Sequence, residues 1–151
     1  MFYNRKQAGE LLGKALTFYS GKEDVVVLGI PRGGMVPAYE VAKFLNVPLD
    51  LVLVKKLGHP MNSEYAIGAV SMEDVLLLTH ENISEDYLEQ EVKKVRAKIK
   101  DQSSKFSIGR KAIVLKNKTV IIVDDGIATG MTIFMVIELV KKAGAKNIIV
   151  A

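Results

Sequence analysis

The sequence predicts an α/β fold in which an open, mainly parallel sheet is flanked by helices. Two apolar segments, Asp24–Ile30 and Thr119–Val123, are rich in β-branched residues and lack polar alternation, which is typical of parallel strands buried on both faces. A segment with helical spacing follows each of them, and strand, helix and strand in this order predict right-handed crossovers between parallel strands. We expect residues 1–151 to form a single domain.

The first third of the chain predicts a helix followed by a βαβ unit. Apolar residues recur at helical spacing over Asn4–Ser20, which we expect to form an amphipathic helix that covers the sheet and stops at Gly21. After the strand at 24–30, Met35–Leu45 has the spacing of a second helix. Leu49–Val54 then predicts the next strand.

A hairpin and a long helix are expected in the middle of the chain. Tyr65–Val70 and Val75–Thr79 predict two short antiparallel strands at the edge of the sheet. Asn82–Phe106 predicts the longest helix, which begins with a capping box formed by Asn82 and Glu85. An apolar stripe runs along this segment, so we expect its many charges to lie on a solvated face.

Composition restricts the classes of function. The chain has no cysteine, which excludes disulfides, thiolate metal sites and cysteine nucleophiles and is compatible with a reducing compartment. No window approaches the ~20 apolar residues of a membrane span, and charges interrupt the N-terminal segment, so we expect a cytoplasmic protein without membrane contact. The formal net charge is +4, but no interleaving of basic and aromatic residues favours nucleic acid, and a polyanionic small molecule explains the excess as well. The composition is also compatible with a homo-oligomer.

The segment 119–133 reads TVIIVDDGIATGMTI and predicts a phosphate cradle. Asp124 and Asp125 stand at the carboxyl end of the strand, where open α/β sheets bind ligands, and two adjacent carboxylates need hydroxyls, cations or water there. Gly126 and Gly130 permit tight turns, and the N-terminus of the next helix is suited to bind a phosphate. An ordinary strand-to-helix turn would explain the Asp and Gly residues but not the whole string.

This string is similar to the motif that binds phosphoribosyl pyrophosphate (PRPP) in type I phosphoribosyltransferases. The match covers Val123–Asp125, Ile127–Gly130 and Thr132, while Gly126 replaces the aliphatic residue or Ser that is usual in the broad family. That glycine is typical of a branch of predicted phosphoribosyltransferases. The resemblance implies that Asp124 and Asp125 hold the ribose hydroxyls. It further implies that the loop and the first helical turn bind the 5′-phosphate, through Gly126, Ile127, Ala128, Thr129, Gly130 and Thr132.

The resemblance covers nearly the whole chain but leaves its C-terminal edge incomplete. We expect a helix over Gly130–Ala143 and the start of a strand at Asn147–Ala151. A type I core usually continues with a further strand and a capping hood. We therefore expect that strand and hood to be missing, either because the chain is shortened or because a partner completes this edge.

A second loop follows the first strand and directly precedes a helix. Its successive glycines let the backbone approach an anion, and Arg32 offers a bidentate fork to phosphate, although a simple βα turn is the alternative for this segment alone. In family terms the loop resembles the pyrophosphate loop. The contacts that this implies come from Pro31, Arg32, Gly33 and Gly34.

A basic pair, Lys55 and Lys56, follows the second strand and resembles a pyrophosphate-binding pair of related transferases. We predict Lys56 as the pyrophosphate contact. Adjacent strand residues point to opposite faces, so the other lysine could face solvent or cover the sheet. For His59 the sequence leaves three alternatives: a proton donor, a pyrophosphate contact, or a residue without a direct role. The residues that follow are expected to form a flexible loop that closes over the substrate, including Gly58, His59, Asn62, Ser63 and Glu64.

The reaction that the resemblance implies is displacement of pyrophosphate from C1 of PRPP by a nitrogenous acceptor such as a nucleobase. The catalytic roles would fall on Asp124, Asp125, Lys56 and Arg32, with Mg²⁺ carried by PRPP near the two aspartates and no direct protein cage for the ion. Two alternatives are a non-catalytic PRPP-binding regulatory or sensor module and an interaction domain whose vestigial site has no PRPP affinity.

Overall fold

The structure is a computed structural model that describes residues 2–79, 81–106, 111–127 and 130–151. It confirms the predicted α/β class, with one parallel and one antiparallel sheet. The parallel sheet contains, in spatial order, β2 (Leu49–Leu51), β1 (Val25–Gly29), β6 (Thr119–Val123) and β7 (Asn147–Val150). The antiparallel sheet contains β3 (Lys55–His59), β4 (Asn62–Val70) and β5 (Val75–Leu77). The α-helices are α1 (Arg5–Ala15), α2 (Met35–Leu45), α3 (Glu85–Ser104) and α4 (Met131–Lys142).

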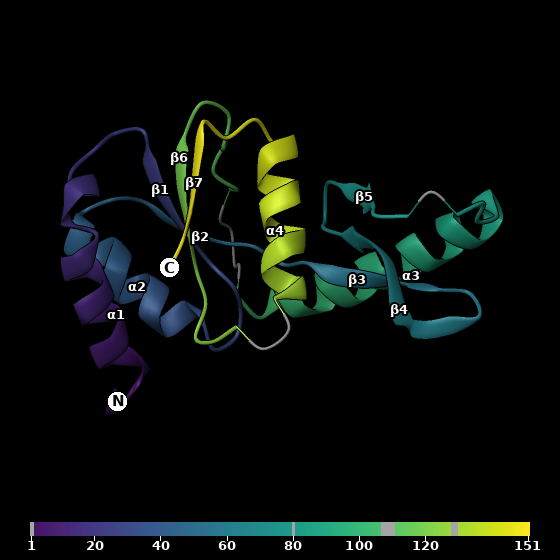
Figure 1. Ribbon diagram of the computed structural model, residues 1–151, viewed down its shortest axis with the longest axis horizontal. Helices are drawn as coiled ribbons and strands as arrows, with labels where there is room; N and C mark the ends of the chain where they lie inside the picture. The colour runs from purple at the N-terminus through teal and green to yellow at the C-terminus, as the bar shows by residue number, and fades with distance from the viewer. Residues whose placement is uncertain (1, 80, 107–110, 128–129) are drawn as a thin grey trace.

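Helices cover both faces of the parallel sheet, with α2 on one face and α4 on the other (Figure 1). β1 and β6 are fully buried, and their residues alternate between the two helices. Val25 packs in a cluster with Leu45 of α2, whereas Val26 packs in a cluster with Val136 of α4. Because the β1–β2 crossover and the β6–β7 crossover lie on opposite faces, the topological switch point falls between β1 and β6.

The N-terminal helix α1 forms a second layer on α2, where the sequence predicted a cover for the sheet. Its glycines permit this close approach. A Cβ atom on Gly9 would lie 2.7 Å from Cα of Pro37, and one on Gly13 would lie 2.8 Å from Cβ of Phe44. A short 3₁₀ helix, Thr17–Tyr19, follows α1.

The antiparallel strands form their own sheet, whereas the sequence predicted a hairpin at the edge of the parallel sheet. The predicted strand 49–54 ends at Leu51, and the segment after it becomes β3, which pairs with β4. Leu57 and Ile67 are fully buried in a cluster with Ile99 of α3. The two lysines and the glycine around Leu57 hide this strand in the sequence, because only one large apolar side chain marks its buried face.

The start of α3 differs from the predicted start of this helix. Ser84 caps α3 by accepting a hydrogen bond from the backbone N–H of Tyr87 at 3.3 Å, so the predicted cap at Asn82 is wrong. α2 and β6 match their predicted bounds.

Within the described residues, no helix has both the length and the apolarity needed to cross a membrane.

Candidate active site

Two glycine-containing loops meet at the switch point. The backbone N–H of Ile30 donates to the carbonyl of Val123 at 3.1 Å, so the loops leave adjacent strands side by side. A Cβ atom on Gly34 would lie 2.9 Å from Cα of Asp124, and one on Gly33 would collide with the carboxylate of Asp125. Both glycines are therefore required by the contact between the loops, which brings together two segments that the sequence analysis assigned to one site.

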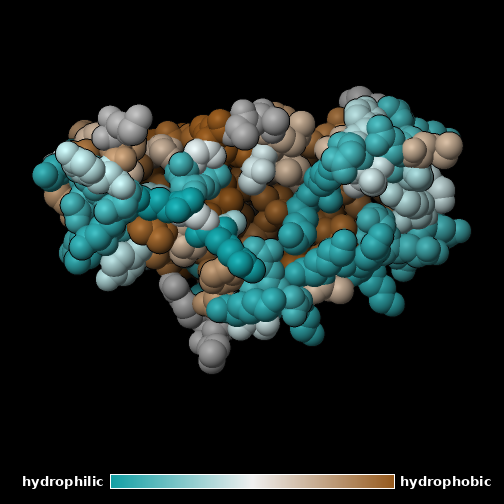
Figure 2. All heavy atoms as spheres, turned by 90° about the horizontal axis from the view of Figure 1, so that it is seen from below, coloured by the Kyte–Doolittle hydropathy of each residue, from teal (hydrophilic) through white to brown (hydrophobic). Residues whose placement is uncertain are grey.

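The carboxyl ends of the parallel strands lie at the bottom of Figure 1 and face the viewer in Figure 2. Hydrophilic side chains gather on this face around hollows in which hydrophobic residues are visible (Figure 2). Cavities border the loop contact on two sides. One is basic and adjoins α3, and the other is largely apolar and adjoins α1.

The two aspartates of the β6–α4 loop differ in their surroundings. The backbone N–H of Asp125 donates to Oδ1 of Asp124 at 2.8 Å. Burial raises the pKa of the Asp124 carboxyl. A hydrogen bond from the guanidinium of Arg5 lowers the pKa of the Asp125 carboxyl. Asp125 is therefore the carboxylate that stays ionised more readily.

Arg5, the first residue of α1, was missed by the sequence analysis. Its Nε lies 2.8 Å and its Nη2 2.6 Å from Oδ2 of Asp125, across 120 residues of sequence. No local pattern marks Arg5 as a site residue, because the contact depends on how α1 is seated on α2. This ion pair brings a cation to the carboxylate pair.

The predicted 5′-phosphate cradle lies between β6 and α4. Gly130 stands at the N-cap of α4 with φ of 76°, a left-handed conformation that favours glycine. Thr132 in the first turn of α4 and Gly126 and Ile127 in the loop are exposed to solvent. Ala128 and Thr129, which the sequence also assigned to this cradle, lie outside the described residues.

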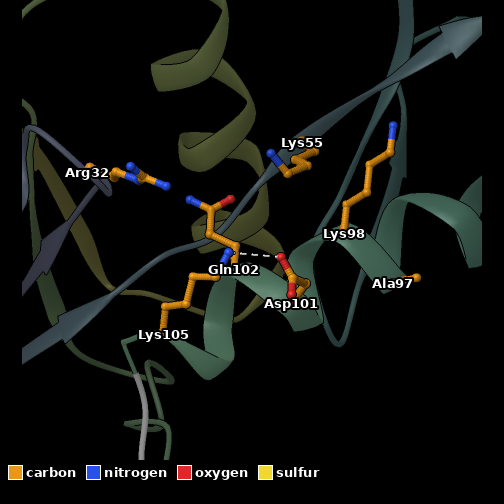
Figure 3. A pocket seen from close by; sticks show the side chains of 7 residues that line it. All are labelled: Arg32, Lys55, Ala97, Lys98, Asp101, Gln102 and Lys105. Carbon is orange, nitrogen blue, oxygen red and sulfur yellow. Dashed lines mark hydrogen bonds and ion pairs between the residues drawn. The ribbon is translucent and has the colours of Figure 1, made fainter.

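The basic cavity has a volume of about 560 Å³ and lies between the β1–α2 loop, β3 and α3. The side chains of Arg32 and Lys55 point toward one another across it, beside the amide of Gln102 (Figure 3). Lys105 on α3 is paired with Asp101 at 3.1 Å. Within the described part of the chain, Arg32 and Lys55 have no anionic partner. Like charges that converge without a counterion repel one another, so this cavity is suited to an anion.

Lys56 points to the other side of β3, as the alternation of strand side chains requires. Its Nζ is paired with Oε2 of Glu64 at 2.9 Å. The structure therefore groups Lys55 with Arg32, and the preference for Lys56 as the pyrophosphate contact finds no support in this arrangement. The charged residues of α3 that line the cavity, among them Lys98, were expected on a solvated face.

The predicted flexible loop 58–64 forms the end of the β3–β4 hairpin, so strand residues stand where the sequence predicted a loop. Gly58 and His59 belong to β3, and Asn62, Ser63 and Glu64 belong to β4. Nε2 of His59 lies 3.2 Å from Oε2 of Glu81, and its Nδ1 accepts from the backbone N–H of Met61 at 3.1 Å. His59 thus contacts the hairpin turn and Glu81, which lies between β5 and α3, and it does not line the cavity of Arg32.

An apolar groove of about 400 Å³ lies on the other side of the carboxylate pair. Phe2, Leu11 and Leu12 contribute to its lining, together with Pro37 at the start of α2. The groove also reaches both aspartates, Arg5 and Ala151 at the end of β7. The described residues contain no group of three or more His, Cys, Asp or Glu side chains that could hold a metal ion.

Comparisons with known proteins found a family, relatives and solved structures that are similar to this chain. Residues 4–151 match the family described as phosphoribosyl transferase domain. A Mycobacterium tuberculosis protein, provisionally described as a phosphoribosyl transferase, is 37% identical over 100% of this chain, which spans 35% of that protein. The crystal structure of the protein TT1426 from Thermus thermophilus has a TM-score of 0.87 and 38% identity, and covers 99% of this chain and 73% of its own. A purine phosphoribosyltransferase from Pyrococcus horikoshii has a TM-score of 0.53 and 28% identity, over 95% of this chain and 68% of its own.

Proposed function

This chain belongs to the phosphoribosyl transferase domain family, and we propose that it binds PRPP with Mg²⁺ and transfers the 5-phosphoribosyl group to a nitrogenous acceptor, with release of pyrophosphate. The observation that carries the proposal is the carboxylate pair at the switch point, which contacts the loop of Arg32 and precedes the start of α4. Arg32 and Lys55 line the basic cavity and have no anionic partner among the described residues. These parts fit the ribose, the pyrophosphate and the 5′-phosphate of one PRPP molecule. The chain spans about a third of the Mycobacterium tuberculosis relative, since it covers 35% of that protein's length.

The basic cavity would hold the pyrophosphate. Negative charge develops on this group as its bond to C1 breaks, so fixed cations and backbone donors there stabilise the transition state more than the ground state. Arg32 and Lys55 would supply the cations. Pro31, Gly33 and Gly34 lie on the same loop as Arg32, and the two glycines lie against Asp125 and Asp124 of the β6–α4 loop. Mg²⁺ would be carried by the PRPP phosphates near Asp124 and Asp125, because this ion binds few carboxylates and retains several waters. When bound, it neutralises part of the charge of the leaving group.

The carboxylate pair would hold the ribose through its hydroxyl groups. Breaking the bond to pyrophosphate leaves positive charge on the sugar ring, and the ionised carboxylate of Asp125 is placed to stabilise it. The loop from Gly126 to Thr132 would bind the 5′-phosphate by backbone amides and hydroxyls. Together, the carboxylate pair and this loop would orient PRPP for attack at C1.

The apolar groove beside α1 would admit the acceptor. A nucleophile that displaces pyrophosphate approaches C1 from the face opposite the leaving group, and the groove and the basic cavity lie on different sides of the carboxylate pair. Its lining of Phe2, Leu11 and Leu12 favours a flat, largely apolar ring over a charged acceptor.

The test separates binding from turnover. Calorimetry with PRPP and Mg²⁺ is expected to show saturable binding, and a screen of nucleobases should then identify an acceptor that causes pyrophosphate release. Binding without release for any base would instead identify a PRPP-binding regulatory module. Absence of PRPP binding would leave only the interaction domain with a vestigial site.

The β3–β4 hairpin provides a further prediction. We expect hydrogen exchange of the peptide Gly58–Glu64 to slow when PRPP and Mg²⁺ are added, because this polar end of the hairpin that carries Lys55 would close over bound pyrophosphate. The β4–β5 turn at 71–74 serves as the control peptide within the same sheet. Unchanged exchange at 58–64 under conditions where calorimetry shows binding would argue against closure.

A further inference from the structure

We infer that Arg5 is a positioning residue for ribose recognition, which holds Asp125 so that the carboxylate pair presents acceptor oxygens to two neighbouring hydroxyls. This inference rests on the proposed function. It concerns a residue of the N-terminal helix, far from the β6–α4 loop in sequence, and it assigns that helix a part in substrate binding.

The hydrogen bonds at the carboxylate pair hold one identified oxygen of each residue. Nε and Nη2 of Arg5 approach Oδ2 of Asp125, at 2.8 and 2.6 Å. Oδ1 of Asp124 accepts the backbone N–H of Asp125 at 2.8 Å. The two carboxyl groups also contact each other through a side-chain hydrogen bond. Because each carboxylate oxygen can accept more than one hydrogen bond, both side chains retain acceptor capacity for the vicinal hydroxyls of a ribose.

The backbone around Arg5 is held in place independently of this ion pair. The side chain of Asn4 caps α1 by accepting from the N–H of Gln7 at 2.9 Å, and Oε1 of Gln7 accepts from the N–H of Tyr3 at 2.8 Å. The contacts of Gly9 and Gly13 with α2 fix the helix further along. The side chain of Arg5 therefore extends from a fixed helix end to the carboxylate that the proposed function assigns to the sugar.

The ion pair has little value as a stabilising contact, which favours a role in binding. The side chain of Arg5 is 59% exposed, and pairs of this kind contribute little to the free energy of folding because water screens them. At the site its effect is larger, since two neighbouring carboxylates repel each other and a cation on one of them offsets that repulsion. Removal of Arg5 would release Asp125 to rotate away from the ribose position without unfolding the helix.

The experiment compares three ligands across matched variants. Dissociation constants for PRPP with Mg²⁺, ribose 5-phosphate and pyrophosphate are measured for the parent, Arg5→Gln, Arg5→Lys and Lys6→Gln. Lys6 is the control because it is the next residue of α1 and pairs with Glu10 at 3.9 Å. We expect Arg5→Gln to weaken PRPP and ribose 5-phosphate about tenfold, as for loss of one charge-assisted contact, and to leave pyrophosphate unchanged. Arg5→Lys should recover part of the loss, and Lys6→Gln should behave as the parent.

Each other outcome overturns the inference in a recognisable way. Equal losses for all three ligands would show that Arg5 supports the fold, and unchanged or tighter ribose 5-phosphate binding by Arg5→Gln would show that Arg5 does not position Asp125 for the sugar. In both cases binding of PRPP by the parent leaves the proposed function standing. If the parent binds neither PRPP nor ribose 5-phosphate, the proposed function fails and the inference fails with it.

Discussion

Replacement of Asp125 by Asn is expected to weaken PRPP binding by about 10–100-fold, the loss of a charge-assisted hydrogen bond worth ~1.5–3 kcal/mol. The substitution keeps the shape of the side chain but removes the negative charge of the carboxylate, which accepts from Arg5 and, in the proposed function, from a ribose hydroxyl. Combined with Thr129→Ala, which the sequence predicts to remove a 5′-phosphate contact, it should abolish most of the affinity. Calorimetry with PRPP and Mg²⁺ measures both effects.

A matched control for this prediction is Asp74→Asn. Asp74 lies in the β4–β5 turn, where it pairs with Lys142 at 2.8 Å and lines neither cavity beside the carboxylate pair. Its replacement should leave PRPP binding unchanged. If the Asp125 and Thr129 double variant titrates like the parent, the assignment of the β6–α4 loop to PRPP is wrong.

Loss of Arg32 should weaken binding of the pyrophosphate end of PRPP and not of its ribose 5-phosphate end. Arg32→Ala is expected to weaken PRPP and pyrophosphate by about 10–100-fold, since one charge-assisted contact of ~1.5–3 kcal/mol is removed, and to leave ribose 5-phosphate nearly unchanged. Lys55→Ala should act in the same direction, because the two side chains point toward one another across the basic cavity (Figure 3). Competition calorimetry with the three ligands measures the pattern.

The neighbouring lysine provides the control on the same strand. Lys56→Ala removes the same charge from the protein but takes it from the opposite face of β3, where it is paired with Glu64. It should leave all three affinities close to those of the parent. A larger effect from Lys56 than from Lys55 would restore the preference drawn from the sequence, and equal losses for all ligands with Arg32→Ala would indicate a role in folding.

The parts of this molecule that could be predicted from the sequence are those governed by local periodicity. The helix Met35–Leu45 is found within its predicted bounds, because its apolar positions follow one face and Asn46 ends it in a left-handed conformation. The strand Thr119–Val123 is likewise confirmed, since every residue in it is buried. The meeting of the two glycine loops could also be anticipated, because parallel strands present their carboxyl ends at one edge of a sheet.

The parts that could not be predicted depend on contacts between distant segments. Alternation shows that Lys55 and Lys56 face opposite ways, but only the packing of β3 against α3 decides which of them meets Arg32. The contact of Arg5 with Asp125 depends on the angle at which α1 crosses α2. Gly9 and Gly13 permit the close approach of the two helices, but their spacing does not show which residue of α1 reaches the β6–α4 loop.

The seating of α1 on α2 has a thermodynamic consequence. α2 begins directly after Gly34, and α1 carries Arg5, so one helix pair joins the loop of Arg32 to the carboxylate of Asp125. In the proposed function, a ligand that shifts the start of α2 would also shift Arg5, which would link the free energies of binding at the two ends of PRPP. Linkage of this kind is reciprocal. Bound pyrophosphate would raise the affinity for the sugar by the same factor as the bound sugar raises the affinity for pyrophosphate. Departure of pyrophosphate would then loosen the hold on the ribosylated product and favour its release.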